Sequence, residues 1–133
     1  MCVTPIRSIC ANPCSRSSIC CMSEEMVIFT RTYDFISWLL PLTEHFPRSQ
    51  RFVVTQRLQH AALNFQELIM EANAERGPHR MEKLRSADTE LRKVRLYLRL
   101  GQKWDWIKEG QYRHASMQVM EIGKLLGGWK KAS

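Results

Sequence analysis

The stretch Met81–Trp104, MEKLRSADTELRKVRLYLRLGQKW, decides the fold of this chain because it has the pattern of an amphipathic helix. Its apolar residues recur at spacings of three and four, which places them on one face of an α-helix. These residues are Leu84, Ala87, Leu91, Val94 and Leu98. A stripe of this kind is buried against other helices, so the stretch predicts one wall of a helical bundle.

The side of this helix away from that stripe is basic. We call its six cations the basic ridge: Arg85, Arg92, Lys93, Arg95, Arg99 and Lys103. At a rise of 1.5 Å per residue the ridge spans roughly 27 Å, long enough to meet several phosphates spaced about 3.4 Å apart along a nucleic-acid strand. Contacts of this type give affinity without sequence selectivity. The alternative is a solvated face with intrahelical ion pairs such as Asp88–Arg92.

A second apolar stripe lies on the same helix, away from the first. It consists of Leu96, Tyr97, Leu100 and Trp104. One stripe is enough to build a bundle core, and obligate subunit interfaces are largely apolar. We therefore expect the second stripe to be an interface with another copy of the chain.

The rest of the sequence from residue 24 to 133 also has a helical pattern. We expect a first helix capped by Ser23 and closed by Phe46-Pro47, a second from Ser49 to the Gly77-Pro78 break, a third from about His79 to Lys103, and a fourth ending at Gly127-Gly128. Their expected inward residues include Tyr33 in the first helix and Phe52 and Val53 in the second. The predicted fold is an all-α, antiparallel up-down-up-down four-helix bundle.

Residues 1–23 lie outside this helical pattern. We interpret them as a disordered leader, or as a stretch translated upstream of a true start at Met22 or Met26. All five cysteines lie here, an odd number with none in the body of the chain, so they do not form a disulfide framework. Their spacing lacks the CxxC knuckles typical of zinc sites. The leader has no apolar core of a signal peptide, and we expect a cytoplasmic protein.

Composition and motifs favour binding over catalysis. The formal net charge of +7 favours an anionic partner. The sequence has no Glu-x-x-His motif of di-iron bundles, no phosphate-binding glycine loop and no nucleophile elbow. We expect no enzymatic activity, no cofactor, no metal and no membrane partner.

The sequence also resembles a known family, the accessory variability proteins (Avd) of diversity-generating retroelements, and more distantly the four-helix proteins of bacterial 23S rRNA intervening sequences. The resemblance covers about residues 26–131. Four segments carry it: Phe46–Phe52 (FPRSQRF), the helix around Gln56–Leu58, Leu91–Leu100 (LRKVRLYLRL) and Glu121–Trp129 (EIGKLLGGW).

This resemblance implies a homopentameric ring of four-helix bundles with a basic surface. It implies binding to a reverse transcriptase and to RNA or DNA, in support of mutagenic retrohoming, with no catalysis by the accessory protein. It assigns no individual site residues, so the basic ridge is expected to be the binding surface on physical grounds alone.

Two other functions remain open from the sequence. One is an RNA-binding bundle of the rRNA intervening-sequence type with no reverse-transcriptase partner. The other is an enzyme, such as a small helical ribonuclease or a metal-dependent oxidase, whose active site assembles from residues far apart in the sequence.

Overall fold

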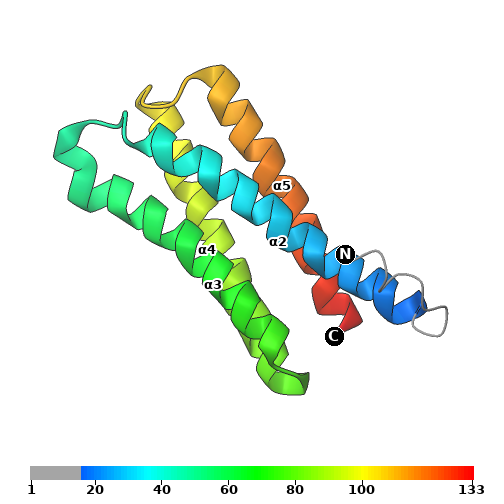
Figure 1. Ribbon diagram of the computed structural model, residues 1–133. Helices are drawn as coiled ribbons and strands as arrows, with labels where there is room; N and C mark the ends of the chain where they lie inside the picture. The colour runs from blue at the N-terminus through cyan, green and yellow to red at the C-terminus, as the bar shows by residue number, and fades with distance from the viewer. Residues whose placement is uncertain (1–15) are drawn as a thin grey trace, which may run out of the picture.

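The computed structural model describes residues 16–133, with side chains from Val27 onward, and this part is almost entirely helical (Figure 1). It contains four long α-helices: α2 (Arg16–Thr43), α3 (Gln56–Ala74), α4 (Gly77–Lys103) and α5 (Glu109–Ala132). A 3-10 turn, η2 (Arg48–Gln50), and a π-helical turn, η3 (Arg51–Thr55), connect α2 to α3. Within residues 16–133 there is no β-strand.

Consecutive helices run in opposite directions (Figure 1). The most extensive pairing is between α3 and α4, while α2 packs against α5 and α3, and α5 also packs against α4. The α2–α3 and α4–α5 connections lie together at one end, which we call the upper end after its place in Figure 1, and the α3–α4 turn lies at the other end with the C-terminus. The predicted antiparallel four-helix bundle is confirmed.

One apolar core runs through all four helices. The predicted stripe of α4, from Leu84 to Leu98, is fully buried, with each of its five residues 2% exposed or less. It belongs to the same buried cluster as Leu58, Phe65 and Ile69 of α3, and the rest of this cluster comes mainly from α2 and α5. Burying a side chain of this size stabilises the fold by roughly 1.5–3 kcal/mol, so the core fixes the positions of the outward-facing residues.

Three residues expected in the core are exposed instead. Tyr33 is 68% exposed because α2 turns the neighbouring Thr32 toward the core instead. A pattern of apolar residues does not include the polar Thr32, so it could not predict this. Phe52 and Val53 are 77% and 50% exposed. They lie in η3, where the wider π-helical turn breaks the 3.6-residue periodicity on which the prediction relied.

Several helix ends also differ from the prediction. Helix α2 begins at Arg16, so Ser23 lies inside it rather than capping it. Ser49 lies inside η2, and the residue at the N-terminal cap of α3 is Thr55. Helix α5 continues through Gly127-Gly128 to Ala132. The reason is Trp129, which is only 7% exposed and packs edge-on against Phe29 with the ring centres 6.1 Å apart; this burial outweighs the low helix propensity of glycine.

The leader is largely outside the described part of the chain. Residues 1–15 are not described, and neither are the side chains of residues 16–26, so the possible metal site among the leader cysteines lies outside the described side chains.

Asp105 closes α4 at the upper end. Its φ of 61° is the left-handed conformation that usually requires glycine. The amide of Trp106 donates to the carbonyl of Gly101 at 2.8 Å, and that of Asp105 to the carbonyl of Gln102 at 3.2 Å. This is the Schellman arrangement of a helix C-terminus. It turns the chain sharply, so that α5 returns alongside α4.

Candidate nucleic-acid interface

All six cations of the predicted basic ridge are exposed, but they point in three directions. Arg85, Arg92, Arg99 and Lys103 are separated by seven or four residues and follow one outward line along α4. Lys93 lies on the side of α4 that faces α3, and Arg95 on the side that faces α5. The ridge is therefore not one uniform surface, and its members have different electrostatic surroundings.

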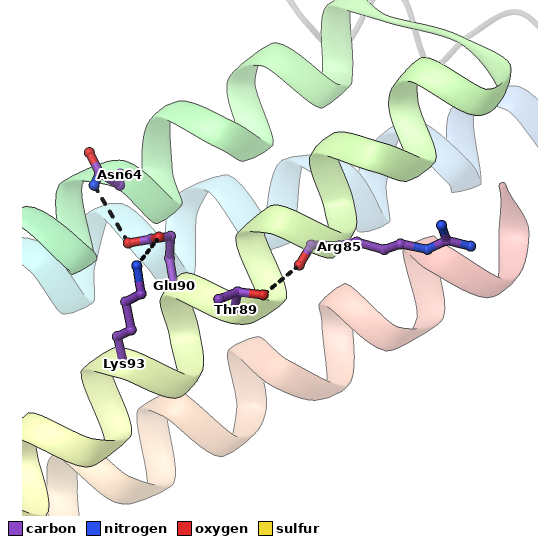
Figure 2. Close-up of polar contacts among 5 residues, drawn as sticks. All are labelled: Asn64, Arg85, Thr89, Glu90 and Lys93. Carbon is purple, nitrogen blue, oxygen red and sulfur yellow. Dashed lines mark hydrogen bonds and ion pairs between the residues drawn. The ribbon is translucent and has the colours of Figure 1, made fainter.

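Lys93 is neutralised by a neighbour. Its Nζ donates to Oε2 of Glu90 at 2.9 Å, and Oε1 of Glu90 accepts a 3.5 Å hydrogen bond from Asn64 of α3 (Figure 2). The Glu90 side chain is only 13% exposed, so it is held in place between the helices. Figure 2 also shows the Arg85 side chain extending away from this cluster. Lys93 thus helps to join α4 to α3, and less of its charge is available to a ligand.

The predicted Asp88–Arg92 pair is present, with Nη2 of Arg92 3.2 Å from Oδ2 of Asp88. The Arg92 side chain is 73% exposed. Exposed pairs of this kind are worth about 0.2–1 kcal/mol and are screened by salt. Arg92 can therefore leave Asp88 for a phosphate at little cost.

Arg95, Arg99 and Lys103 line a groove between α4 and α5. Two adjoining hollows, of about 150 and 510 Å³, share Arg99 and Tyr112. Leu96 also lines the larger hollow, and Ser116 the smaller one. We call this surface the α4–α5 groove; its residues used below are Arg95, Leu96, Arg99, Lys103, Tyr112 and Ser116. It extends along α4 toward the upper end of the bundle.

The three cations of this groove have no acidic partner among the side chains that the structure describes. Among the side chains of residues 27–133, no carboxylate lies within 4.0 Å of Arg95, Arg99 or Lys103. Positive charge without a local counter-charge attracts anions strongly. Tyr112 adds an aromatic ring, on which a nucleic-acid base can stack, and Ser116 adds a hydroxyl that can donate to a phosphate.

Gly123 of α5 makes room for Arg95. A β-carbon at Gly123 would lie 2.8 Å from Nη2 of Arg95 and 3.6 Å from a methyl carbon of Leu91. A side chain at this position would push the guanidinium away. The glycine therefore sets where one of the groove's charges lies.

Two other cations near the start of α4 are used for packing. Arg80 Nε donates to the carbonyl oxygens of Ala72 and Glu75 at 3.0 and 2.9 Å, which satisfies the C-terminal end of α3. Its guanidinium also lies over the Trp129 ring, 5.9 Å from the ring centre. Lys83 Nζ lies 2.8 Å from Glu71 Oε1 on α3, and the hydrogen bond to Glu71 raises the pKa of Lys83.

The second stripe of α4 is only partly exposed. Leu96 is 51% and Trp104 53% exposed, whereas Tyr97 and Leu100 are half-buried and Tyr97 packs against the core. Trp104 lies beside Trp106 with the ring centres 5.4 Å apart. The apolar surface that α4 offers to another molecule is therefore centred on Leu96 and Trp104.

The structure brings some of the predicted site residues together in one groove, and it adds two residues that the sequence did not indicate. Arg95, Leu96, Arg99 and Lys103 share the groove, while Arg85 lies about 15 Å before Arg95 along the helix axis. The added residues are Tyr112 and Ser116. Their spacing of four places both on one side of α5, but nothing in the sequence says that this side faces Arg99.

The described part of the chain offers no separate metal or membrane feature. Among the side chains of residues 27–133 there is no group of three or more histidine, cysteine or acidic residues placed to hold a metal ion. In the same part of the chain, every helix is too short or too polar to cross a bilayer.

Comparisons with known proteins give two findings. Residues 26–133 match the protein family described as bAvd-like. The fold is similar to the crystal structure of a protein of unknown function from the S23 ribosomal protein family of Bacteroides thetaiotaomicron, with a TM-score of 0.74 and 22% sequence identity, over 81% of this chain and 98% of that chain. No curated protein matches the sequence. At this identity the structural likeness concerns the fold alone.

Proposed function

Because the chain belongs to the bAvd-like family, we propose that it is a non-catalytic accessory protein of a diversity-generating retroelement, acting in the cytoplasm. In this role it binds the element's reverse transcriptase and nucleic acid, the template RNA or its cDNA copy, and so supports mutagenic retrohoming. Membership of the family supports the class of function, and the surface of α4 supports the mode of binding.

The observation that carries this proposal is the α4–α5 groove. Arg95, Arg99 and Lys103 line it without acidic partners among the described side chains, next to the ring of Tyr112. Phosphate contacts supply most of the affinity of sequence-independent nucleic-acid binding, and an aromatic ring adds stacking with any base. These are the properties that an adaptor needs when it holds a transcript without reading its sequence.

We further propose that several copies assemble into a ring, a homopentamer. Leu96, which lines the groove, and Trp104, which does not, supply exposed apolar surface on α4. A ring would place several grooves near one another, so that contacts that are weak in one subunit act together on a single strand.

A second candidate function is an RNA-binding bundle without a reverse-transcriptase partner, of the rRNA intervening-sequence type. The α4–α5 groove supports this second function as well as the first, because binding of RNA by its cations does not require a polymerase. The two functions differ in whether a polymerase binds.

The test of nucleic-acid binding compares two double charge reversals with the same net change. The first, Arg99→Glu with Lys103→Glu, alters the groove. The control, Arg76→Glu with Lys131→Glu, alters exposed cations at the opposite end of the bundle. Affinity for a single-stranded RNA is measured at several salt concentrations.

We expect the groove variant to bind about tenfold more weakly or worse, since a lost charge-assisted contact costs roughly 1.5–3 kcal/mol. The salt dependence of log K should also fall by about one unit per lost phosphate contact, while the control keeps the wild-type slope. Equal slopes in the two variants would show that net charge alone, and not the groove, attracts the RNA.

A further inference from the structure

A second polar pocket lies at the upper end of the bundle, where α2 turns into α3. It has a volume of about 550 Å³, within the usual range for small-ligand sites. Its lining comes from the end of α2, from η2 and η3, and from the start of α3. Part of it is the Phe46–Phe52 segment, whose polar residues have no role in the proposed groove. We call it the corner pocket.

Two arginines line the corner pocket. Arg48 lies in η2 and Arg51 in η3, and both are exposed. Among the side chains of residues 27–133, neither has a carboxylate within 4.0 Å, although Glu44 also lines the pocket. A guanidinium presents several N–H donors in a plane, a geometry that suits phosphate and carboxylate oxygens.

Thr55 supplies a buried hydroxyl with no hydrogen-bond partner among the described residues. It lines the pocket at the end of η3, is 7% exposed, and its Oγ1 forms no hydrogen bond with the rest of the described chain. An unsatisfied buried hydroxyl is costly, so native structures rarely retain one without a use. The π-helical turn that ends at Thr55 is of a type often found at functional sites.

The neighbouring polar groups are already paired. Gln59 Nε2 donates to Thr43 Oγ1 at 2.8 Å, and Thr43 Oγ1 donates to the carbonyl of Leu40 at 2.7 Å. This chain of hydrogen bonds fixes the α2–α3 side of the pocket and joins the two helices. Apart from the Glu44 carboxylate, the side-chain groups left for a ligand are the two guanidinium groups and the Thr55 hydroxyl, all of which can donate.

We propose that the corner pocket binds a phosphate-type oxyanion, held by Arg48 and Arg51 and by the hydroxyl of Thr55. A set of donors with two positive charges suits an anion with several acceptor oxygens. A divalent metal ion would need several oxygen ligands with negative charge, and Glu44 is the one carboxylate in the lining. The site is separate from the α4–α5 groove and does not depend on the function proposed for it.

The phosphate group has two possible sources. It can be a free phosphorylated small molecule, or a backbone phosphate of a nucleic acid. The pocket lies at the same end of the bundle as the α4–α5 connection, and Phe46, which lines the pocket, packs against Trp106 of that connection with the ring centres 5.6 Å apart.

The test is thermal unfolding of the full chain in inorganic phosphate, compared with sodium chloride at the same ionic strength. We expect phosphate to raise the Tm of the wild type above its value in chloride. Phosphate also stabilises folded proteins in general, so the rise should become smaller in Arg48→Ala with Arg51→Ala and keep its full size in Arg57→Ala, a neighbouring exposed arginine outside the pocket. No rise in the wild type, or an equal rise in the double variant, would overturn the proposal.

Thr55→Val gives a second readout that a merely structural role would not produce. Removing an unsatisfied buried hydroxyl should raise the Tm in chloride, while the additional rise caused by phosphate becomes smaller. A Tm in chloride at or below the wild-type value, or a phosphate-induced rise as large as in the wild type, would contradict the role given to Thr55.

The affinity of the arginine double variant for adenosine monophosphate and for a short single-stranded RNA identifies the source of the phosphate. Binding of the monophosphate should weaken about tenfold or more in either case. If RNA binding weakens as well, the occupant is a backbone phosphate; if RNA binding is unchanged, it is a free phosphorylated molecule. Unchanged binding of both would overturn the proposal.

Discussion

The guanidinium group of Arg95 on α4 lies against Gly123 on α5, with Nη2 2.8 Å from the point that a β-carbon at Gly123 would occupy. The missing side chain of Gly123 therefore leaves space between the two helices, and the positively charged guanidinium group of Arg95 occupies it. Gly123 belongs to the EIGKLLGGW segment, and this contact gives a physical reason for a glycine at that position.

Replacing Gly123 with alanine should separate binding from stability. The added methyl group displaces only the flexible end of Arg95, and alanine favours a helix over glycine by about 1 kcal/mol, so urea denaturation should show equal or higher stability. Nucleic-acid affinity should fall because the guanidinium moves. Gly127→Ala is the control, since a β-carbon there meets nothing within 4 Å among the described side chains. Equal affinity in the two variants would mean that the position of Arg95 does not matter.

The cations of the ridge should contribute unequally to RNA binding. Lys93 is paired with Glu90, whereas Arg99 has no acidic partner among the described side chains. Arg99→Ala should weaken RNA binding about tenfold, and Lys93→Ala should weaken it less. Both affinities are measured by titration of a labelled RNA in the same buffer. A larger loss from Lys93→Ala would show that the Glu90 pair opens on binding.

Arg80 should matter for folding and not for binding. It donates to two carbonyl oxygens at the end of α3 and covers Trp129 of α5. Arg80→Ala should lower the free energy of unfolding by roughly 1–3 kcal/mol, since the partly buried carbonyl of Ala72 and the exposed carbonyl of Glu75 both lose a charged donor. Arg76→Ala, an exposed neighbour, should change it by less than about 0.5 kcal/mol. Urea denaturation followed by circular dichroism measures both changes in the free energy of unfolding. Similar changes in the two variants would show that the contacts of Arg80 do not stabilise the fold.

The proposed ring depends on the exposed apolar pair Leu96 and Trp104. Light scattering should give a mass several times the subunit mass of 15.6 kDa for the wild type, and a lower mass for Leu96→Ser with Trp104→Ser. Met70→Ser with Met117→Ser is the control, because those side chains are also exposed, at 57% each, but lie on α3 and α5. A wild-type monomer would exclude the ring, and an unchanged mass in the Leu96 and Trp104 variant would place the interface elsewhere.

The sequence predicted the bundle because the apolar periodicity of α4 is strong and unbroken. Each of Leu84, Ala87, Leu91, Val94 and Leu98 is buried as expected. The incorrect predictions of burial arose where the helical periodicity changes, or where a polar residue is buried in the core. The π-helical turn η3 exposes Phe52 and Val53, and the buried Thr32 displaces Tyr33. A regular pattern cannot show where a helix widens by a residue.

The candidate site was less predictable. The sequence showed that α4 carries many cations, but not which of them have acidic neighbours on other helices. Glu90, which pairs with Lys93, is held by a hydrogen bond from Asn64, a residue 26 positions earlier in the sequence. The contact between Arg95 and Gly123 likewise joins two different helices. Such pairings depend on how each helix is rotated in the bundle, which a single sequence does not specify.

A pull-down experiment would decide whether the α4–α5 groove is part of a polymerase adaptor. The purified full chain is immobilised and incubated with the reverse transcriptase of its own element and the template RNA, at about 0.15 M salt. We predict that the wild type and the Arg76→Glu, Lys131→Glu control retain the polymerase and the RNA, and that the Arg99→Glu, Lys103→Glu variant loses both. A wild type that retains no polymerase, or a groove variant that retains as much as the wild type, would contradict the proposed function.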